Sequence, residues 1–105
     1  MMAAASCVRV LLHAPTAGAF ERARNNAANL LKEEPGAQVR IVANAAAVAA
    51  ALDAPPHPAD AHTWLCPNTL ARLDRPARAP QRALPQAAVL ALALLQDEGW
   101  RYIRA

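Results

Sequence analysis

The sequence predicts one α/β domain in which helices cover both faces of a parallel or mixed β-sheet. The first reason is the order of its elements, because short apolar runs alternate with segments of helical periodicity as β-α-β-α-β-α-β-α-β. The second is the length, since 105 residues suffice for a single domain spanning residues 1–105 and are too few for two. The third is the composition, 55% hydrophobic but only 4% aromatic, which predicts a core of Ala, Val and Leu.

The chain opens with a strand, a helix and a second strand. Residues 7–13 are a β-branched, Leu-rich run with one charge, typical of a mostly buried strand. Residues 17–34 follow as a helix that Pro35 and Gly36 end, and residues 38–43 alternate before they turn apolar, as a strand does. The apolar stripe of the helix consists of Phe20, Ala23, Ala27, Leu30 and Leu31.

The middle of the chain leads to a cysteine at the end of a strand. Residues 45–52 are expected to form a short Ala/Val helix capped by Asn44. Residues 53–60 contain three prolines within four residues, which remove backbone donors and fix φ, so an irregular surface loop is expected there. The loop leads into a short apolar strand ending at Cys66, and residues 68–73 then form one or two helical turns.

The last third of the chain contains a loop, a helix and two strands. Residues 74–81 form a second loop with proline and arginine, and residues 82–84 are a short strand that a proline ends. Residues 86–98 form a helix, which Gly99 ends in a left-handed cap. Residues 100–104 alternate with a period of two and close the chain as a strand.

The final helix is apolar around its whole circumference, because every residue from 87 to 95 is apolar. Such a helix is buried on more than one side. In a domain of this size one helix face ordinarily meets water, so the run predicts that a neighbouring subunit covers it. The alternative is a central helix enclosed by its own domain.

Composition and charge limit the partners. Eleven basic and eight acidic residues give a net charge of +3, a modest excess that does not by itself indicate nucleic acid. The basic loop lacks aromatic residues on which bases could stack, so we expect a solvated loop and no nucleic-acid partner. Its arginines are Arg72, Arg75, Arg78 and Arg82.

The sequence also predicts a cytoplasmic protein. No apolar run reaches the ~18 residues that a membrane span needs, and residues 1–6 lack the charged segment of a signal peptide, so no membrane partner is expected. Two cysteines are too few for a disulfide framework. Cys7 starts the first strand and Cys66 ends the third, so a bond between them is not expected.

Three polar side chains follow or end the first three strands. If these strands run parallel, His13, Asn44 and Cys66 lie together at the carboxyl edge of the sheet, here called the rim. Open α/β sheets bind ligands at this edge. The helix start after Cys66 favours the thiolate, although Pro67 removes one donor near the sulfur. The alternatives are an inert buried thiol at Cys66 and a backbone-satisfied histidine at His13.

Other chemistries find no support in the sequence. No CxxC or HxxxH spacing indicates a metal site, so no metal is expected. The three glycines stand alone, in no phosphate-binding or dinucleotide motif, so no cofactor is expected either. No Ser-His-Asp order stands out.

Four segments, in order over nearly the whole chain, carry a resemblance to a known family. They are Arg24–Leu31, Val39–Ala43, Leu65–Leu70 and, above all, Leu95–Arg104 (LQDEGWRYIR). Together they resemble the DsrE/DsrF-like proteins. Each segment alone has low specificity, while the order and spacing of the four together are more specific.

The resemblance implies a three-layer sandwich around a mostly parallel five-stranded sheet, assembled into oligomers that are often trimers or hexamers. In family members with a known role, a cysteine carries persulfide sulfur and passes it to a partner protein, and Cys66 matches that cysteine. Asn26 and Asn29 match asparagines common in the helix, and Asn68 lies in the matching turn. Gln96, Glu98, Gly99 and Tyr102 match the closing motif.

The chain departs from the family pattern at three places. Asn44 and Ala45 stand where related sequences tend to have His-Gly, and Pro67 stands where glycine is frequent. The loop at residues 74–81 is shortened. Backbone approach and proton transfer at the rim are therefore expected to differ.

The leading hypothesis is an oligomeric, DsrE-like persulfide carrier that uses Cys66, with Asn26, Asn68, His13 and Asn44 as binding residues. Its partners would be a sulfur donor and an acceptor protein. The second hypothesis is a binding or assembly module of the same fold with an inert cysteine. A third is a cysteine-dependent enzyme acting on a carbon electrophile, for which no positioned base is evident.

Overall fold

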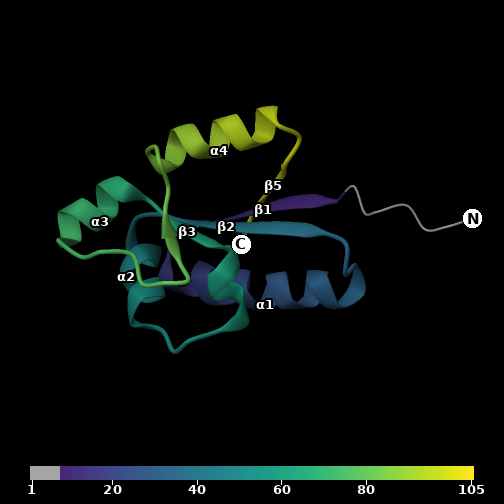
Figure 1. The fold of residues 1–105 in the computed structure, drawn as a ribbon, viewed down its shortest axis with the longest axis horizontal. Coiled ribbons are helices and arrows are strands. Elements are labelled where there is room, and N and C mark those ends of the chain that lie inside the picture. Colours follow the sequence, from purple (N-terminus) through teal and green to yellow (C-terminus); the bar gives the residue numbers. More distant parts are fainter. Residues whose placement is uncertain (1–7) are drawn as a thin grey trace, which may run out of the picture.

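The computed structural model, which describes residues 8–105, confirms the predicted α/β class. A single five-stranded sheet, parallel throughout, has the strand order β4-β3-β2-β1-β5 (Figure 1). The strands are β1 (Arg9–Ala14), β2 (Gln38–Ala43), β3 (Thr63–Leu65), β4 (Arg82–Ala83) and β5 (Arg101–Arg104). The helices are α1 (Ala17–Glu33), α2 (Ala46–Asp53), α3 (Pro67–Leu73) and α4 (Ala88–Asp97), with a 3₁₀ helix, η1 (Pro58–His62).

The helices form the two outer layers of a sandwich. Helices α1 and α2 lie on one side of the sheet and α4 lies on the other, while α3 projects beyond the sheet at the edge where β3 ends (Figure 1). The central strands β1 and β2 are covered on both faces, so Leu11, Ile41 and Val42 are fully buried. This explains why these strands read as nearly continuous apolar runs in the sequence.

Helix α1 follows from local sequence signals. The Thr16 hydroxyl accepts a hydrogen bond from the Ala19 amide (3.0 Å), which satisfies one free donor of the first turn. The predicted stripe packs on the sheet, with Phe20 and Ala27 buried and Leu30 half-buried. The boundaries agree with the expected ones to within one residue.

Two expectations about the segment between β2 and β3 are wrong. Asn44 does not cap α2, because Ala45 is the cap residue and the Asn44 side chain bonds to another strand. The proline-rich segment is not entirely irregular, since η1 starts inside it at Pro58. A proline at the first position of a helical turn needs no donor, and the His57 ring caps the turn by accepting a hydrogen bond from Ala59 (2.9 Å).

The chain reverses at Gly99 between α4 and β5, as the sequence predicts. Gly99 has φ +97°, and a side chain there would bring its Cβ within 2.7 Å of the Arg9 guanidinium. Arg9 donates to the Glu98 carbonyl, one of the last oxygens of α4. The backbone conformation therefore favours glycine here, whereas the Arg9 guanidinium is the end of a flexible side chain that can move aside.

Helix α4 is not enclosed by its own domain. Its buried face consists of Ala88, Ala91, Leu92 and Leu95. The opposite face is apolar and open, with Val89 78% exposed and Leu90 48% exposed. The enclosure alternative is therefore wrong for the single chain, and the cover by a neighbouring subunit stays a prediction.

Arginine and tryptophan side chains alternate in a row across the α4 side of the sheet. Arg40 lies over the rings of both Trp64 and Trp100, at 4.8 and 5.0 Å from their centroids. Arg82 lies over Trp64 and Arg9 lies over Trp100, each at 5.3 Å. Trp64 and Trp100 thus cover sheet surface together with the stems of these arginines.

Candidate functional site

The parallel pairing of β1, β2 and β3 confirms that their carboxyl ends meet at one rim. The pairing continues just past the strands, where the Asn44 amide donates to Ala14 (3.1 Å) and the Cys66 amide donates to Ala43 (2.9 Å). His13 is the next-to-last residue of β1. The three polar residues that the sequence singled out therefore follow or end three adjacent strands.

Cys66 lies at the junction of β3 and α3, where it is the N-cap residue of the helix. Its exposed fraction is only 6%, yet the residue borders an open pocket of about 270 Å³. Cys66 is thus a buried residue that lines the wall of this pocket. The pocket is lined by Asn44, Ala45, Cys66, Asn68, Thr69, Arg72, Ala87, Ala88 and Val89.

The surroundings of Cys66 favour the thiolate. Burial raises the pKa of the Cys66 thiol, but hydrogen bonds from the backbone of Ala88, Thr69 and Asn68 and from the Thr69 hydroxyl outweigh it. The pKa of Cys66 therefore lies below the value of an ordinary thiol. These donors come from the first turns of two helices, α3 and α4, whose amide ends favour negative charge.

Pro67 weakens this arrangement less than the sequence suggested. It occupies the first position of α3, where a proline is well tolerated. The next two amides, of Asn68 and Thr69, still reach the sulfur, and Ala88 adds a donor from α4. One lost donor is therefore replaced by a neighbour that is distant in sequence.

A second set of contacts joins His13 to the pocket. Its Nε2 atom is 2.9 Å from Oδ1 of Asn44, and its Nδ1 atom is 2.5 Å from the Tyr102 hydroxyl. His13 is therefore satisfied by side chains, not by the backbone. It does not line the Cys66 pocket itself and reaches it through Asn44.

The structure brings together most of the predicted site residues. Cys66, Asn44 and Asn68 line one pocket, and His13 contacts Asn44. Asn26 does not join them: it is exposed on α1, on the opposite side of the sheet from α4. Its proposed binding role has no geometric link to Cys66.

Four residues of this site were not assigned to it from the sequence. Thr69 stands three residues after Cys66, the spacing at which first-turn side chains bond back to a cap residue, and this signal was available. Arg72 was assigned to the solvated basic loop, although it is the basic residue in the last turn of α3 and lines the pocket. Ala88 and Tyr102 reach the rim only through the tertiary fold, although Tyr102 belongs to the closing motif that resembles the DsrE/DsrF-like proteins.

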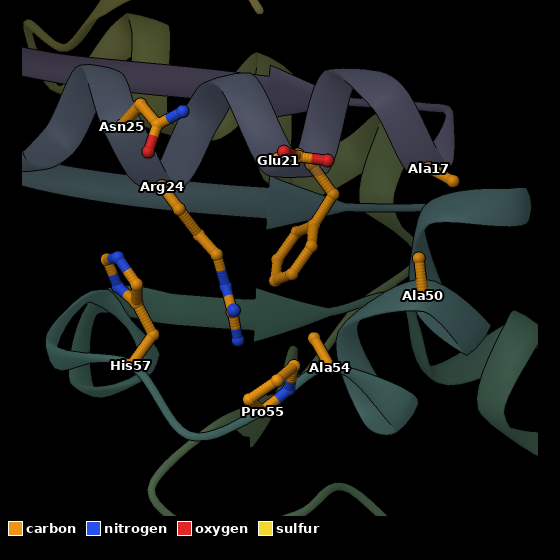
Figure 2. A pocket seen from close by; sticks show the side chains of 9 residues that line it. Ala17, Glu21, Arg24, Asn25, Ala50, Ala54, Pro55 and His57 are labelled. Atoms are coloured by element: carbon orange, nitrogen blue, oxygen red, sulfur yellow. The ribbon is translucent and has the colours of Figure 1, made fainter.

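Another pocket lies on the opposite side of the sheet, between α1 and the segment that follows α2 (Figure 2). It has a volume of about 510 Å³. The Arg24 side chain extends from α1 toward the loop that carries Pro55 and His57 (Figure 2). Its guanidinium forms an ion pair of 2.8 Å with the buried Asp60.

Asp60 is the centre of a buried polar cluster, in which Arg24 Nε, Arg78 Nε and Gln81 Oε1 have no hydrogen-bond partner among the described residues. Its carboxylate also accepts hydrogen bonds from the His57 amide (3.1 Å), Gln81 (3.4 Å) and Arg78 (3.4 Å). Arg78 and Gln81 in turn donate to the carbonyl of Ala51 in α2. The cluster ties α1, α2, η1 and the second loop together, so its role is structural.

Neither a metal site nor a membrane span is evident in the described part of the chain. Among residues 8–105, no three His, Cys, Asp or Glu side chains are close enough to hold a metal ion together. None of the helices in that range is both long and apolar enough to cross a bilayer.

No protein-family model matches the chain, and no curated protein matches it.

Proposed function

We propose that this chain is a DsrE-like sulfur carrier in which Cys66 accepts a sulfane sulfur atom as a persulfide and passes it on. The observation that carries the proposal is the set of donors around the sulfur, which lowers the pKa of Cys66 at the edge of an open pocket. The thiolate is the form that attacks sulfur. The four segments that resemble the DsrE/DsrF-like proteins support the same function.

The chemistry needs no external oxidant. The Cys66 thiolate attacks the outer sulfur of a donor persulfide, R–S–SH, so one S–S bond forms as another breaks and R–S⁻ leaves. A thiolate of the acceptor then attacks the outer sulfur of Cys66–S–SH, and the Cys66 thiolate leaves. A low thiol pKa helps both steps, because it favours the nucleophile in the first and the leaving group in the second.

Mass spectrometry tests the carrier role. The experiment uses Cys7→Ser protein, so that Cys66 is the remaining thiol. Incubation with a persulfide donor should add about 32 Da, the mass of one sulfur atom, and a reductant should remove it. The matched Cys7→Ser, Cys66→Ser protein should gain nothing. Equal labelling of both proteins would refute the carrier role.

A binding or assembly module with an inert cysteine is the second candidate, and the 6% exposure of Cys66 favours it. The alkylation rate of Cys66 against pH separates the two. A carrier should reach half of its maximal rate below pH ~8.5, the pKa of an ordinary thiol. An inert thiol should react slowly throughout, with its midpoint at or above that pH.

We also propose that a second copy of the chain covers the open face of α4, in a trimer or hexamer as the resemblance implies. The exposed Val89, Leu90 and Leu94 support this, because contiguous apolar surface is characteristic of interfaces. Sedimentation at micromolar concentration should show an oligomer that Val89→Glu dissociates. Asn29→Glu adds the same charge to an exposed position of α1 and should leave the oligomer intact. A monomeric wild type would refute the proposal.

We also propose that the protein acts in a reducing, cytoplasmic environment. It rests on the low cysteine count and on the chemistry, because a carrier thiol must not be consumed in a stable disulfide.

A further inference from the structure

A chain of three hydrogen-bonded side chains runs along the rim from β5 to the Cys66 pocket. The Tyr102 hydroxyl is 2.5 Å from His13 Nδ1, and His13 Nε2 is 2.9 Å from Asn44 Oδ1. Because an amide oxygen only accepts, Nε2 of His13 must donate to Asn44. In the neutral ring Nδ1 then accepts a hydrogen bond from the Tyr102 hydroxyl. The two hydrogen bonds therefore run in one direction, from Tyr102 to His13 and from His13 to Asn44.

This chain fixes the orientation of the Asn44 amide. With Oδ1 bonded to His13, the NH₂ group of Asn44 is left for another acceptor, and none is found for it among residues 8–105. Asn44 borders the same pocket as Cys66. The NH₂ group is thus a donor held in place beside the pocket by two residues that do not line it.

The rest of the pocket favours negative charge as well. Thr69 and the amides of Asn68 and Ala88 donate toward the sulfur, and the Arg72 guanidinium adds a positive charge. No Asp or Glu is among the described residues that line the pocket. A site with donors and a cation but no carboxylate favours a negatively charged ligand.

We propose that Asn44, positioned by His13 and Tyr102, donates to the charged end of an anionic sulfur donor and so selects a small oxyanion of the thiosulfonate class. This inference rests on the proposed carrier function. The Cys66 thiolate attacks the terminal sulfur of R–SO₂–S⁻, the bond between the two sulfurs of the donor breaks, and its electron pair leaves with the sulfinate R–SO₂⁻. Cys66–S–S⁻ remains, so charge and atoms balance.

Two alkylating reagents test this without interference from the thiol pKa. Iodoacetate is an anion and iodoacetamide is neutral, and both consume the same Cys66 thiolate. The rate constant for iodoacetate divided by that for iodoacetamide, at one pH, therefore measures how strongly the pocket prefers an anionic reagent to a neutral one. In Cys7→Ser protein this ratio should exceed the ratio measured for free cysteine.

The variants remove the two ends of the hydrogen-bonded series of side chains, Asn44 and Tyr102. Asn44→Ala should lower the ratio by roughly threefold or more, as expected for one lost bond to a charged group. Tyr102→Phe removes one oxygen at the far end of the chain and should lower the ratio in the same direction. Gln38→Ala removes an exposed amide at the other end of β2 and should leave it unchanged. A purely structural role for Tyr102 would move the urea midpoint but not this ratio.

The outcomes separate the two proposals. If Asn44→Ala and Tyr102→Phe both keep the wild-type ratio, anion selection is wrong, even when a persulfide donor still labels Cys66. If the ratio responds but Cys66 never gains sulfur from methanethiosulfonate or from a persulfide donor, the carrier function is wrong. If Asn44→Ala does not fold, Tyr102→Phe alone decides.

Discussion

The polar clusters around Asp60 and Cys66 differ in the groups that surround the charged atom. Around Asp60, a buried carboxylate pairs with Arg24 and Arg78 and accepts a hydrogen bond from Gln81, so its negative charge is compensated by side chains of the same protein. Around Cys66, donors converge on a thiol and a pocket that no described acidic residue lines. The first cluster therefore stabilises the fold, while the second stabilises a thiolate and leaves the Asn44 NH₂ group beside the pocket for an incoming group.

The largest expected effect tests the stabilising role of the Asp60 cluster. Asp60→Asn removes the carboxylate and leaves the Arg24 guanidinium buried without its counter-charge. Breaking one partner of a buried pair costs about 3–5 kcal/mol of unfolding free energy. Urea denaturation measures this cost, and the alkylation rate of the folded Cys66 should not change.

Asp53→Asn is the matched control for that variant. Asp53 pairs with Arg75 at the same 2.8 Å, but both side chains are largely exposed. Exposed pairs contribute roughly 0–1 kcal/mol, so the loss should be small. Equal losses in the two variants would mean that burial does not distinguish the two ion pairs.

Two buried threonines sharpen the contrast between the clusters. Thr63 donates to the Ala59 carbonyl (2.8 Å) on the η1 side, whereas Thr69 donates to Cys66. Thr63→Val should cost about 1–3 kcal/mol of stability, because a buried acceptor loses its partner, and should leave Cys66 reactivity unchanged.

Thr69→Val should act in the opposite way. Loss of a hydrogen bond to the charged sulfur raises the pKa of Cys66, and at neutral pH alkylation should slow by roughly fivefold for a bond worth about 1 kcal/mol. Iodoacetamide kinetics measure the rate, and urea unfolding should show only a minor change. If Thr63→Val slowed alkylation as much as Thr69→Val, the two clusters would not be independent.

A smaller effect is expected at the backbone of the pocket. Ala45 has φ +50° and ψ −134°, a conformation that glycine adopts easily and alanine does not. Ala45→Gly should therefore stabilise the fold by about 1 kcal/mol. Ala49→Gly, four residues later inside α2, should destabilise it by about 0.5–1 kcal/mol, because glycine is unfavourable in a helix. If Ala45→Gly and Ala49→Gly shifted the urea midpoint in the same direction, Ala45 would not be strained.

The smallest expected effect is a pH dependence of stability. The pKa of Cys66 is lower in the folded chain than in the unfolded one, so the thiolate stabilises the fold above the unfolded pKa. This contribution is lost as the pH falls through the folded pKa. The stability difference between Cys7→Ser protein and its Cys66→Ser derivative should therefore be greater at pH 9 than at pH 6. A difference that shrinks with rising pH would contradict the pKa direction.

The amino-acid sequence by itself determined the elements and their order. Apolar runs, helical stripes and the stops at Pro35 and Gly99 are local signals, so the predicted boundaries agree with the structure closely, apart from the Asn44 cap and η1. The sequence also put Cys66 at the end of a strand and before a helix, because that position depends only on neighbouring residues.

The tertiary structure alone decided what surrounds Cys66. Tyr102 reaches His13 because β5 pairs with β1, and Ala88 reaches the sulfur because α4 begins beside α3. Asp60 likewise meets Arg24 only after η1 packs on α1. The physical reason is that these contacts join residues far apart in the chain, and they depend on a strand order that no local periodicity encodes.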